Sequence, residues 1–276
     1  MNFADNLYSW SLEPQILVAA ALAGTAYGVR LRDLWAHGGA TRHAGDYLRA
    51  GSFGAGLVVL VIALTSPIDR LGEERLFCVH MVQHLLLTDI VPILLLLGLS
   101  RAIMRPLVRR GQPIEKALGV LAHPLTALIA LVVVIWGWHV AAMYELALNH
   151  PLAHQLEHLT FFTAGIAFWW YVIEPVPPRH RLQGMWMPAY VFAAKLTLGA
   201  LGVALAFSPN AIYDFYVEAP RTWGLTAVED LNIGGLVMMA EQSVVLVIFF
   251  SIMLARMLDR SEEMQRRRER FGDYVS

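Results

Sequence analysis

The chain of 276 residues is 57% apolar and only 16% charged, with a mean hydropathy of +0.52. Soluble domains average about 45–50% apolar and roughly 25% charged residues, so this composition indicates a membrane protein. The formal net charge of −1 provides no polybasic character and argues against a nucleic-acid partner. The single cysteine, Cys78, excludes an internal disulfide and any Cys-Cys zinc or iron–sulfur motif.

Seven apolar stretches are long enough to cross a bilayer, which requires about 20 mostly apolar residues in a helix. They lie at about 16–34, 49–65, 76–99, 124–143, 152–173, 184–207 and 231–254. They predict an all-α, polytopic membrane protein with a single seven-helix transmembrane domain at 1–258 and a charged cytoplasmic tail at 259–276. The tail is expected to be a short helix or a disordered end. The first residues are acidic rather than basic, so no signal peptide is expected.

The basic residues between these stretches are unevenly distributed. When the connecting segments are assigned alternately to the two sides, 17 Lys and Arg fall on one side and only Arg70, Arg75 and Arg221 on the other. Lys195 lies inside the sixth stretch. Because basic loops tend to remain in the cytoplasm, we expect the N-terminus outside and the C-terminus in the cytoplasm.

Five histidines fall at a similar depth near the outer end of the predicted spans. His80 and His84 lie on the third stretch, His139 near the end of the fourth, and His154 and His158 at the start of the fifth. Each pair has i, i+4 spacing and therefore shares one helix face. Ionisable residues within spans usually face the bundle interior and mark functional sites.

Imidazole is the commonest side-chain ligand for transition metals, and thioethers favour copper(I). Met81 lies beside His80, so the sequence predicts a copper site whose ligands are His80, His84, His139, His154, His158 and Met81. Glu157 is expected to orient a neighbouring imidazole. His150, which precedes Pro151, is expected to cap a helix or lie at the surface.

Other interpretations of the polar residues remain open. The histidines could be structural, or one from each pair could ligate a non-covalent haem in an electron-transfer protein, since no C-x-x-C-H motif is present. A solute transporter would use Asp89, Lys195 and Glu241, but the inner half of the spans is nearly bare of polar residues. Lys195 and Glu241 are instead expected to form a structural ion pair, with Asp89 in a proton relay or a helix–helix hydrogen bond.

The aromatic clusters around Trp138 and Trp169 are expected to anchor the helices at the two membrane interfaces. No phosphate-binding loop, nucleophile elbow or zinc-protease motif is present, so we expect a protein that is not an enzyme.

Several motifs together resemble the CtaG-type (caa-oxidase) cytochrome c oxidase assembly factors, a seven-span membrane family. The resemblance extends from about Thr65 to Gly235 and depends on Ser66-Pro67-Ile68-Asp69, Leu76-Phe77, His80-Met81-Val82-Gln83-His84, Trp138-His139-Val140, Met143-Tyr144, the His154/His158 pair and Phe168-Trp169-Trp170. Two positions depart from the expected pattern: Tyr171 replaces a proline, and Glu229-Asp230-Leu231-Asn232 replaces an Asp-Gln start.

The resemblance implies a bacterial inner-membrane protein that helps to mature a haem–copper oxidase. Its implied role is to insert copper into the binuclear centre of an oxidase subunit, with a periplasmic protein as the copper donor and the lipid bilayer as its environment.

Overall fold

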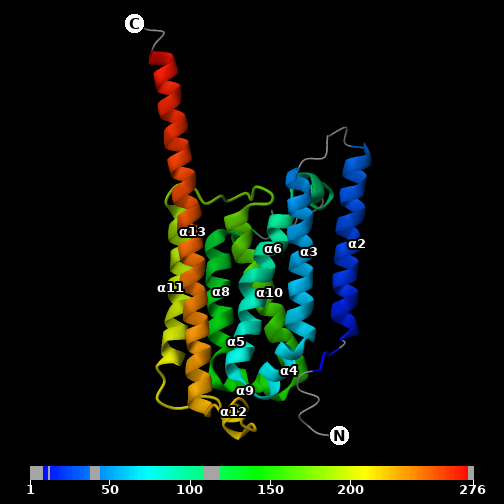
Figure 1. Cartoon of the computed structure of the whole chain (residues 1–276), viewed down its shortest axis with the longest axis vertical. Helices are drawn as coiled ribbons and strands as arrows, with labels where there is room; N and C mark the ends of the chain where they lie inside the picture. The colour runs from blue at the N-terminus through cyan, green and yellow to red at the C-terminus, as the bar shows by residue number, and fades with distance from the viewer. Residues whose placement is uncertain (1–8, 12, 38–43, 109–118, 273–276) are drawn as a thin grey trace.

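The structure is a computed structural model, and it describes residues 9–11, 13–37, 44–108 and 119–272. Within these residues every regular element is a helix, so the predicted all-α fold class is confirmed. The long helices run side by side as an upright bundle, and the last of them extends well beyond it (Figure 1).

The elements follow one another as α2 (Pro14–His37), α3 (Ala44–Thr65), α4 (Pro67–Glu74), α5 (Phe77–Leu85), the π-helical turn η1 (Leu86–Ile90), α6 (Val91–Gly98), the 3-10 turn η2 (Gly119–Ala122), α8 (Pro124–Trp138), α9 (Ala141–Asn149), α10 (Pro151–Ile173), α11 (Trp186–Ala206), α12 (Asp214–Glu218) and α13 (Ala227–Gly272). Residues 101–108 are also helical.

Each of the seven predicted stretches lies in a helix or in adjoining helices, but not all are equally apolar. Among the described residues, four segments are long and apolar enough to cross a membrane: Ala44–Thr65, Phe77–Gly98, Trp186–Ala206 and Ala227–Arg267. A fifth is added if α8 and α9 are counted as one span with a bend of 74°. Helices α2 and α10 are long enough but fall short in apolarity, so by length and composition four to five spans are supported.

The break between α8 and α9 falls at His139. Val140 adopts an extended conformation with φ −64° and ψ 129°, which ends the α8 hydrogen-bond pattern. The chain then turns into α9 and, at Pro151, into α10, where proline suits the first helical position because its missing N–H would have no intrahelical partner. The predicted fourth span is therefore bent near its end, and His139 lies in the bend rather than within a straight helix.

Helices α5 and α6 are joined by the π-helical turn η1, which lies just before Pro92. Because proline has no N–H to donate, regular α-helical hydrogen bonding is interrupted here. Gly165 of α10 packs against this segment so closely that a Cβ atom at residue 165 would lie 2.1 Å from the Thr88 carbonyl oxygen. The absence of a side chain at Gly165 therefore allows α10 to approach η1 and α6.

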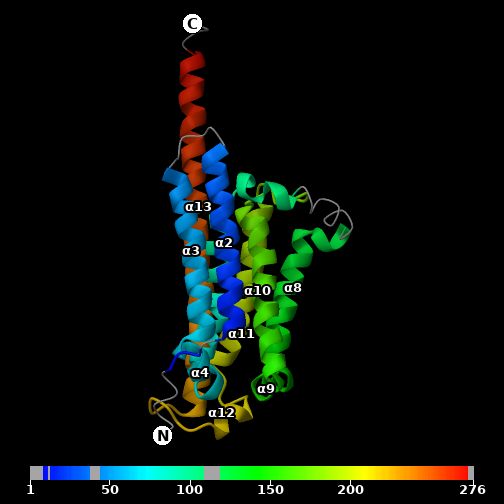
Figure 2. The same cartoon turned by 90° about the vertical axis from the view of Figure 1, so that its right-hand side faces the viewer.

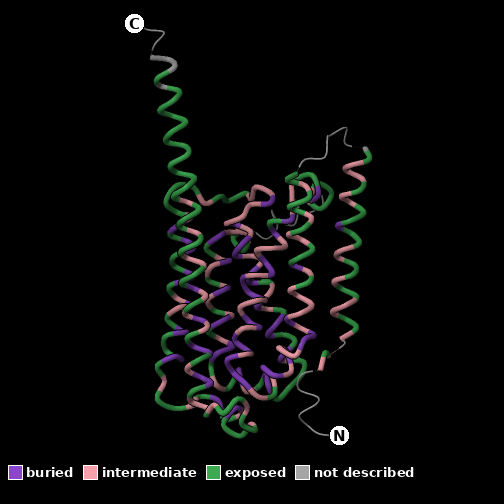
Figure 3. Tube along the Cα trace, in the orientation of Figure 1, coloured by how far each residue is buried: buried purple, intermediate pink, exposed green. Residues whose placement is uncertain are grey.

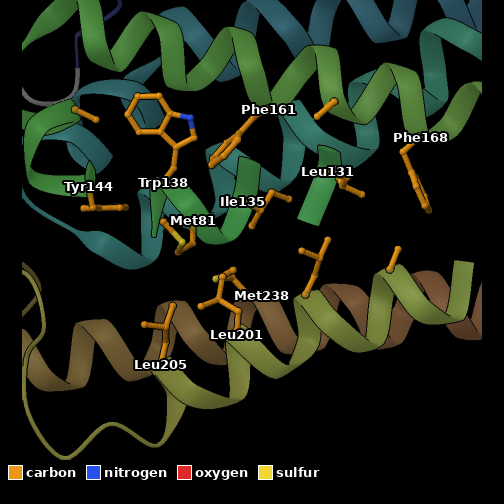
Figure 4. Close-up of a cluster of buried hydrophobic side chains, with 14 of the residues drawn as sticks. Met81, Leu131, Ile135, Trp138, Tyr144, Phe161, Phe168, Leu201, Leu205 and Met238 are labelled. Carbon is orange, nitrogen blue, oxygen red and sulfur yellow. The ribbon is translucent and has the colours of Figure 1, made fainter. Parts of the chain in front are cut away.

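The buried core lies between the central helices. Figure 3 shows buried residues along the middle of the bundle, whereas the far part of α13 is exposed. Figure 4 shows side chains from both sides of the core, with Met81 opposite Met238 and Leu201. The view in Figure 2 separates α8 at one edge of the bundle from α2 and α3 at the other.

The structure changes the expectations for two aromatic residues, Trp169 and Trp138. Trp169 is buried, and its indole N–H donates to Asp89 Oδ1 at 2.7 Å, so its prediction as an interfacial anchor is wrong. Trp138 is likewise buried and donates to Thr160 Oγ1 at 2.9 Å.

The tail continues α13 as a helix up to Gly272.

Some residues used for the predicted orientation lie outside the described residues, namely Arg42, Arg109, Arg110 and Lys116, as does His43.

Candidate metal centre

The five predicted histidines converge at one end of the bundle, where α5 and α10 begin and α8 ends. All five are buried, with at most 9% of any residue exposed. The ring centres of His80 and His84 are 4.1 Å apart, as are those of His154 and His158. His80 and His154 are 5.3 Å apart across the two helices. The structure therefore brings together imidazoles that are up to 78 positions apart in the sequence.

The start of α5 is fixed by a carboxylate from α13. Asp230 accepts hydrogen bonds from the backbone N–H groups of Phe77 at 2.7 Å and Cys78 at 3.0 Å. These are the first groups of α5, whose N–H donors have no partner within the helix. Asp230 thereby positions the turn that carries His80. Cys78 itself is buried but belongs to neither of the metal-competent groups described below.

The outer partners of His80 determine which of its ring nitrogens can bind a metal. Tyr216 Oη donates to the Gly72 carbonyl oxygen at 2.8 Å, so it can only accept from His80 Nδ1, 3.0 Å away. Tyr144 Oη also lies 2.8 Å from this nitrogen. With the hydrogen on Nδ1, the lone pair of His80 is on Nε2, which faces the centre of the cluster.

His139 and His154 are held in the same way. His139 Nδ1 lies 2.7 Å from the Ile135 carbonyl oxygen, which can only accept, so its Nε2 carries the lone pair and lies 3.4 Å from Met81 Sδ. His154 Nδ1 lies 3.5 Å from Glu73 Oε1, and its Nε2 lies 3.3 Å from His80 Nε2. Two imidazole lone pairs therefore face each other, an arrangement that a shared cation would stabilise.

The remaining polar atoms of the cluster have no hydrogen-bond partner among the described residues. These atoms are both ring nitrogens of His84, Nε2 of His158 and both carboxylate oxygens of Glu157. His84 Nε2 lies 3.8 Å from Glu157 Oε1. Buried polar atoms are nearly always satisfied, so this concentration of unpartnered polar atoms makes the cluster a candidate for binding an ion or a ligand.

Two groups of three side chains have ligand atoms within 4.8 Å of one another. One consists of His80, His154 and His158, and the other of His80, His84 and Glu157. Glu157 was expected only to orient an imidazole, but the structure places it among the potential ligands. His139 and Met81 lie beside these groups rather than in them. His150, at the start of α10, is exposed, as expected for a surface residue.

Below the histidines, Asp89, Lys195 and Glu241 form a buried charged group. Lys195 Nζ lies 2.7 Å from Asp89 Oδ1 and 3.7 Å from Glu241 Oε1. The expected Lys195–Glu241 ion pair is present, but the shorter contact is with Asp89. Met81, His84, Asp89 and Gln242 all line one small cavity of about 20 Å³, so the charged group and the metal centre adjoin.

Sequence reasoning missed Tyr216, Asp230 and Glu73, which position the site. Outside the spans, burial raises the pKa of the Tyr216 phenol well above its usual range, so this hydroxyl stays protonated and can donate to Gly72. Burial likewise raises the pKa of Asp69 to about 7. No sequence motif linked Tyr216 to His80, because 136 residues separate them.

A family model described as the cytochrome c oxidase caa3 assembly factor matches residues 25–260. The chain belongs to this family. The chain is also 24% identical to an uncharacterized protein of Mycobacterium leprae, over 84% of this chain and 38% of that protein. It is 25% identical to an uncharacterized protein of Mycobacterium bovis, over 80% of this chain and 36% of that protein. The chain thus spans less than two fifths of these relatives. No solved structure matches it.

Membership of the caa3 assembly factor family confirms the resemblance found in the motifs. The four to five long apolar helices among the described residues fit a membrane environment. The two groups of buried side chains that include the histidines have the spacing to hold a metal ion.

Proposed function

We propose that this protein is a seven-span inner-membrane copper carrier that aids insertion of copper into the binuclear centre of a haem–copper oxidase. The observation that supports it most is the orientation of the imidazoles. His80, His139 and His154 each have Nδ1 engaged by an outer oxygen and Nε2 turned toward another ligand atom. Such outer partners orient metal-binding histidines and raise their basicity.

Copper(I) suits the donor atoms better than harder cations. Met81 Sδ lies 3.4 Å from His139 Nε2, and Met238 from α13 lines the same small cavity. Thioether ligands favour copper(I) and imidazole suits copper among other transition metals, whereas magnesium and calcium prefer oxygen ligands. Copper is the cargo in this proposal, so the protein binds and releases it without a catalytic step.

Seven spans with the N-terminus outside form part of the proposal. Helices α2 and α10 lie alongside the more apolar helices (Figure 1), and the histidine cluster is at the end where α4, α9 and α12 connect them. With the predicted orientation, this end faces the periplasm. There a periplasmic donor can supply copper, and the oxidase subunit can receive it.

A haem is less well accommodated than an ion. The cavity beside His84 and His139 has a volume of only about 20 Å³, close to the space for one water molecule. A porphyrin between these two rings would require the helices to separate. A colourless purified protein would agree with this reasoning, whereas a Soret band would favour the electron-transfer function.

The test is metal analysis by inductively coupled plasma mass spectrometry of the detergent-purified protein, loaded with Cu+ under reducing conditions. We expect stoichiometric copper in the wild type, copper loss in the double variant His80→Ala/His84→Ala, and normal copper in the control His150→Ala. No copper in the wild type, or unchanged copper in the double variant, would refute the proposed site.

A further inference from the structure

A groove leads from the edge of the bundle to the histidine cluster. It encloses a cavity of about 390 Å³ between α2, α3, α4 and α10. Its walls are mostly apolar, with Ile16 and Ala19 from α2 and Leu60 and Leu64 from α3. His154 and His158 also line it, so the groove reaches the candidate metal ligands directly.

The groove carries three acidic side chains and, among the described residues that line it, no lysine or arginine. Glu13 precedes α2, and Asp69 and Glu73 belong to α4. Arg70, which is next to Asp69 in the sequence, does not line the groove and donates to Ser9 Oγ at 3.1 Å. A cleft lined by charges of one sign, with low-dielectric walls, concentrates ions of the opposite sign.

Glu73 connects the surface to the buried cluster. Its side chain is 34% exposed, while its Oε1 lies 3.5 Å from Nδ1 of His154, whose side chain is only 8% exposed. Inside this point, His158 Nε2 is buried and has no hydrogen-bond partner among the described residues, although its side chain lines the groove. A cation at Glu73 is therefore adjacent to His154, whose ring centre lies 4.1 Å from that of His158.

We propose that this groove is the route by which a metal cation reaches the histidine cluster, and that Glu73 is the carboxylate that receives the cation before the imidazoles bind it. The step is an exchange of ligands, in which the cation leaves the Glu73 carboxylate for His158 and then His80, without change of oxidation state. This inference rests on the proposed function, since it supplies the path to the proposed site.

The test measures the rate of copper loading separately from the final amount. The purified protein in lipid nanodiscs is mixed with Cu+ supplied as its cationic acetonitrile complex. The reaction is stopped at set times with an excess of a copper(I) chelator, and the copper retained by the protein is measured. Glu73→Gln removes the charge but keeps the shape, and Glu74→Gln is the matched control because Glu74 is exposed and does not line the groove.

We expect Glu73→Gln to load about tenfold more slowly than both the wild type and Glu74→Gln, when each rate is normalised to the final copper content of that variant. Added salt should slow the wild type more than Glu73→Gln, because ions screen the attraction. Ala19→Trp, which fills the groove, should also slow loading, whereas Ala21→Trp, on the same helix but outside the groove, should not.

Equal loading rates for Glu73→Gln and Glu74→Gln, with copper bound in both, would overturn the route and leave the proposed function intact. Normal loading of Ala19→Trp would also overturn the route, because cations would then reach the histidine cluster without passing through the groove. The groove would in that case hold a lipid chain or another occupant. Absence of copper from the wild type would refute the proposed function and the route together.

Discussion

Replacement of Lys195 by methionine should strongly destabilise the bundle. The side chains of Lys195 and Asp89 are at most 1% exposed, and their charged atoms are 2.7 Å apart. Glu241 lies on the other side of the ammonium group at 3.7 Å. Methionine would fill much of the same space but would leave the Asp89 carboxylate buried without its cation.

The magnitude follows from these distances. At an effective dielectric constant of about 20, the attraction across the Lys195–Asp89 contact is about 6 kcal/mol, and that across the Lys195–Glu241 contact is about 4.5 kcal/mol. Desolvation of the charges offsets much of this attraction, and removal of one partner from a buried pair costs about 3–5 kcal/mol. In a domain of this size, that loss lowers the melting temperature by about 6–20 °C.

The assay is the apparent melting temperature of detergent-purified variants, followed by loss of the monodisperse peak in size-exclusion chromatography. Lys195→Met is compared with Asp89→Asn and with the double variant. The double variant should recover much of the loss, because no uncompensated Asp89 charge remains. Arg266→Met is the surface control, since Arg266 is exposed and its pair with Glu262 contributes about 0–1 kcal/mol.

Two results would refute this reasoning. One is a Lys195→Met protein that melts within the range of Arg266→Met, which would mean that water reaches Asp89. The other is a double variant no more stable than Lys195→Met, which would mean that lost packing, rather than the uncompensated charge, causes the effect.

Three further predictions concern the centre and its surroundings. His84→Ala should lower both the copper content of the protein and the activity of the client oxidase while membrane insertion stays normal on immunoblots of membrane fractions; normal copper in this variant would contradict its role as a ligand. Glu157→Gln should weaken binding of Zn²⁺ more than of Cu+, because a carboxylate is a hard ligand, and competition titrations with metal indicators would detect equal losses if Glu157 is structural. Burial raises the pKa of Asp69 from its ordinary value of 3.8 to about 7, so the folded state holds this proton more tightly than the unfolded chain, and stability falls as the pH rises from about 4 to about 7. The melting temperature of Asp69→Asn should therefore vary less over this range than that of the wild type, and parallel pH profiles would count against Asp69 as the titrating group.

Much of the candidate site could be predicted because helix periodicity and depth are local properties of the sequence. The i, i+4 spacing of His80 with His84, and of His154 with His158, places each pair on one face wherever the helix lies. Because successive apolar stretches cross the membrane in opposite directions, both pairs are then predicted to lie at the same depth. The structure brings the ring of His139 to 6.2 Å from that of His84, measured between ring centres, whereas the bend after Trp138 is not predicted by the sequence pattern.

The contacts that complete the site could not be predicted, because they join segments far apart in the chain. Asp230 caps α5 across 153 positions, and Tyr216 reaches His80 across 136. Trp169 illustrates the same limit. Composition suggested an interfacial anchor, but packing places its N–H against Asp89. Lys195 lies closer to Asp89 than to Glu241 because of the way three helices pack together. The spacing of residues in the sequence does not predict that packing.

In the proposed function, the arrangement of the centre also accounts for release of the cargo. A carrier that surrounded copper with all six predicted ligands would hold it too tightly to transfer it. The structure instead has two overlapping groups that share His80. An ion can therefore move from His154 and His158 to His84 and Glu157 by exchanging ligands stepwise while it remains bound to His80. Because Tyr216 and Tyr144 fix the His80 ring from the other side, the shared ligand stays in place during the exchange.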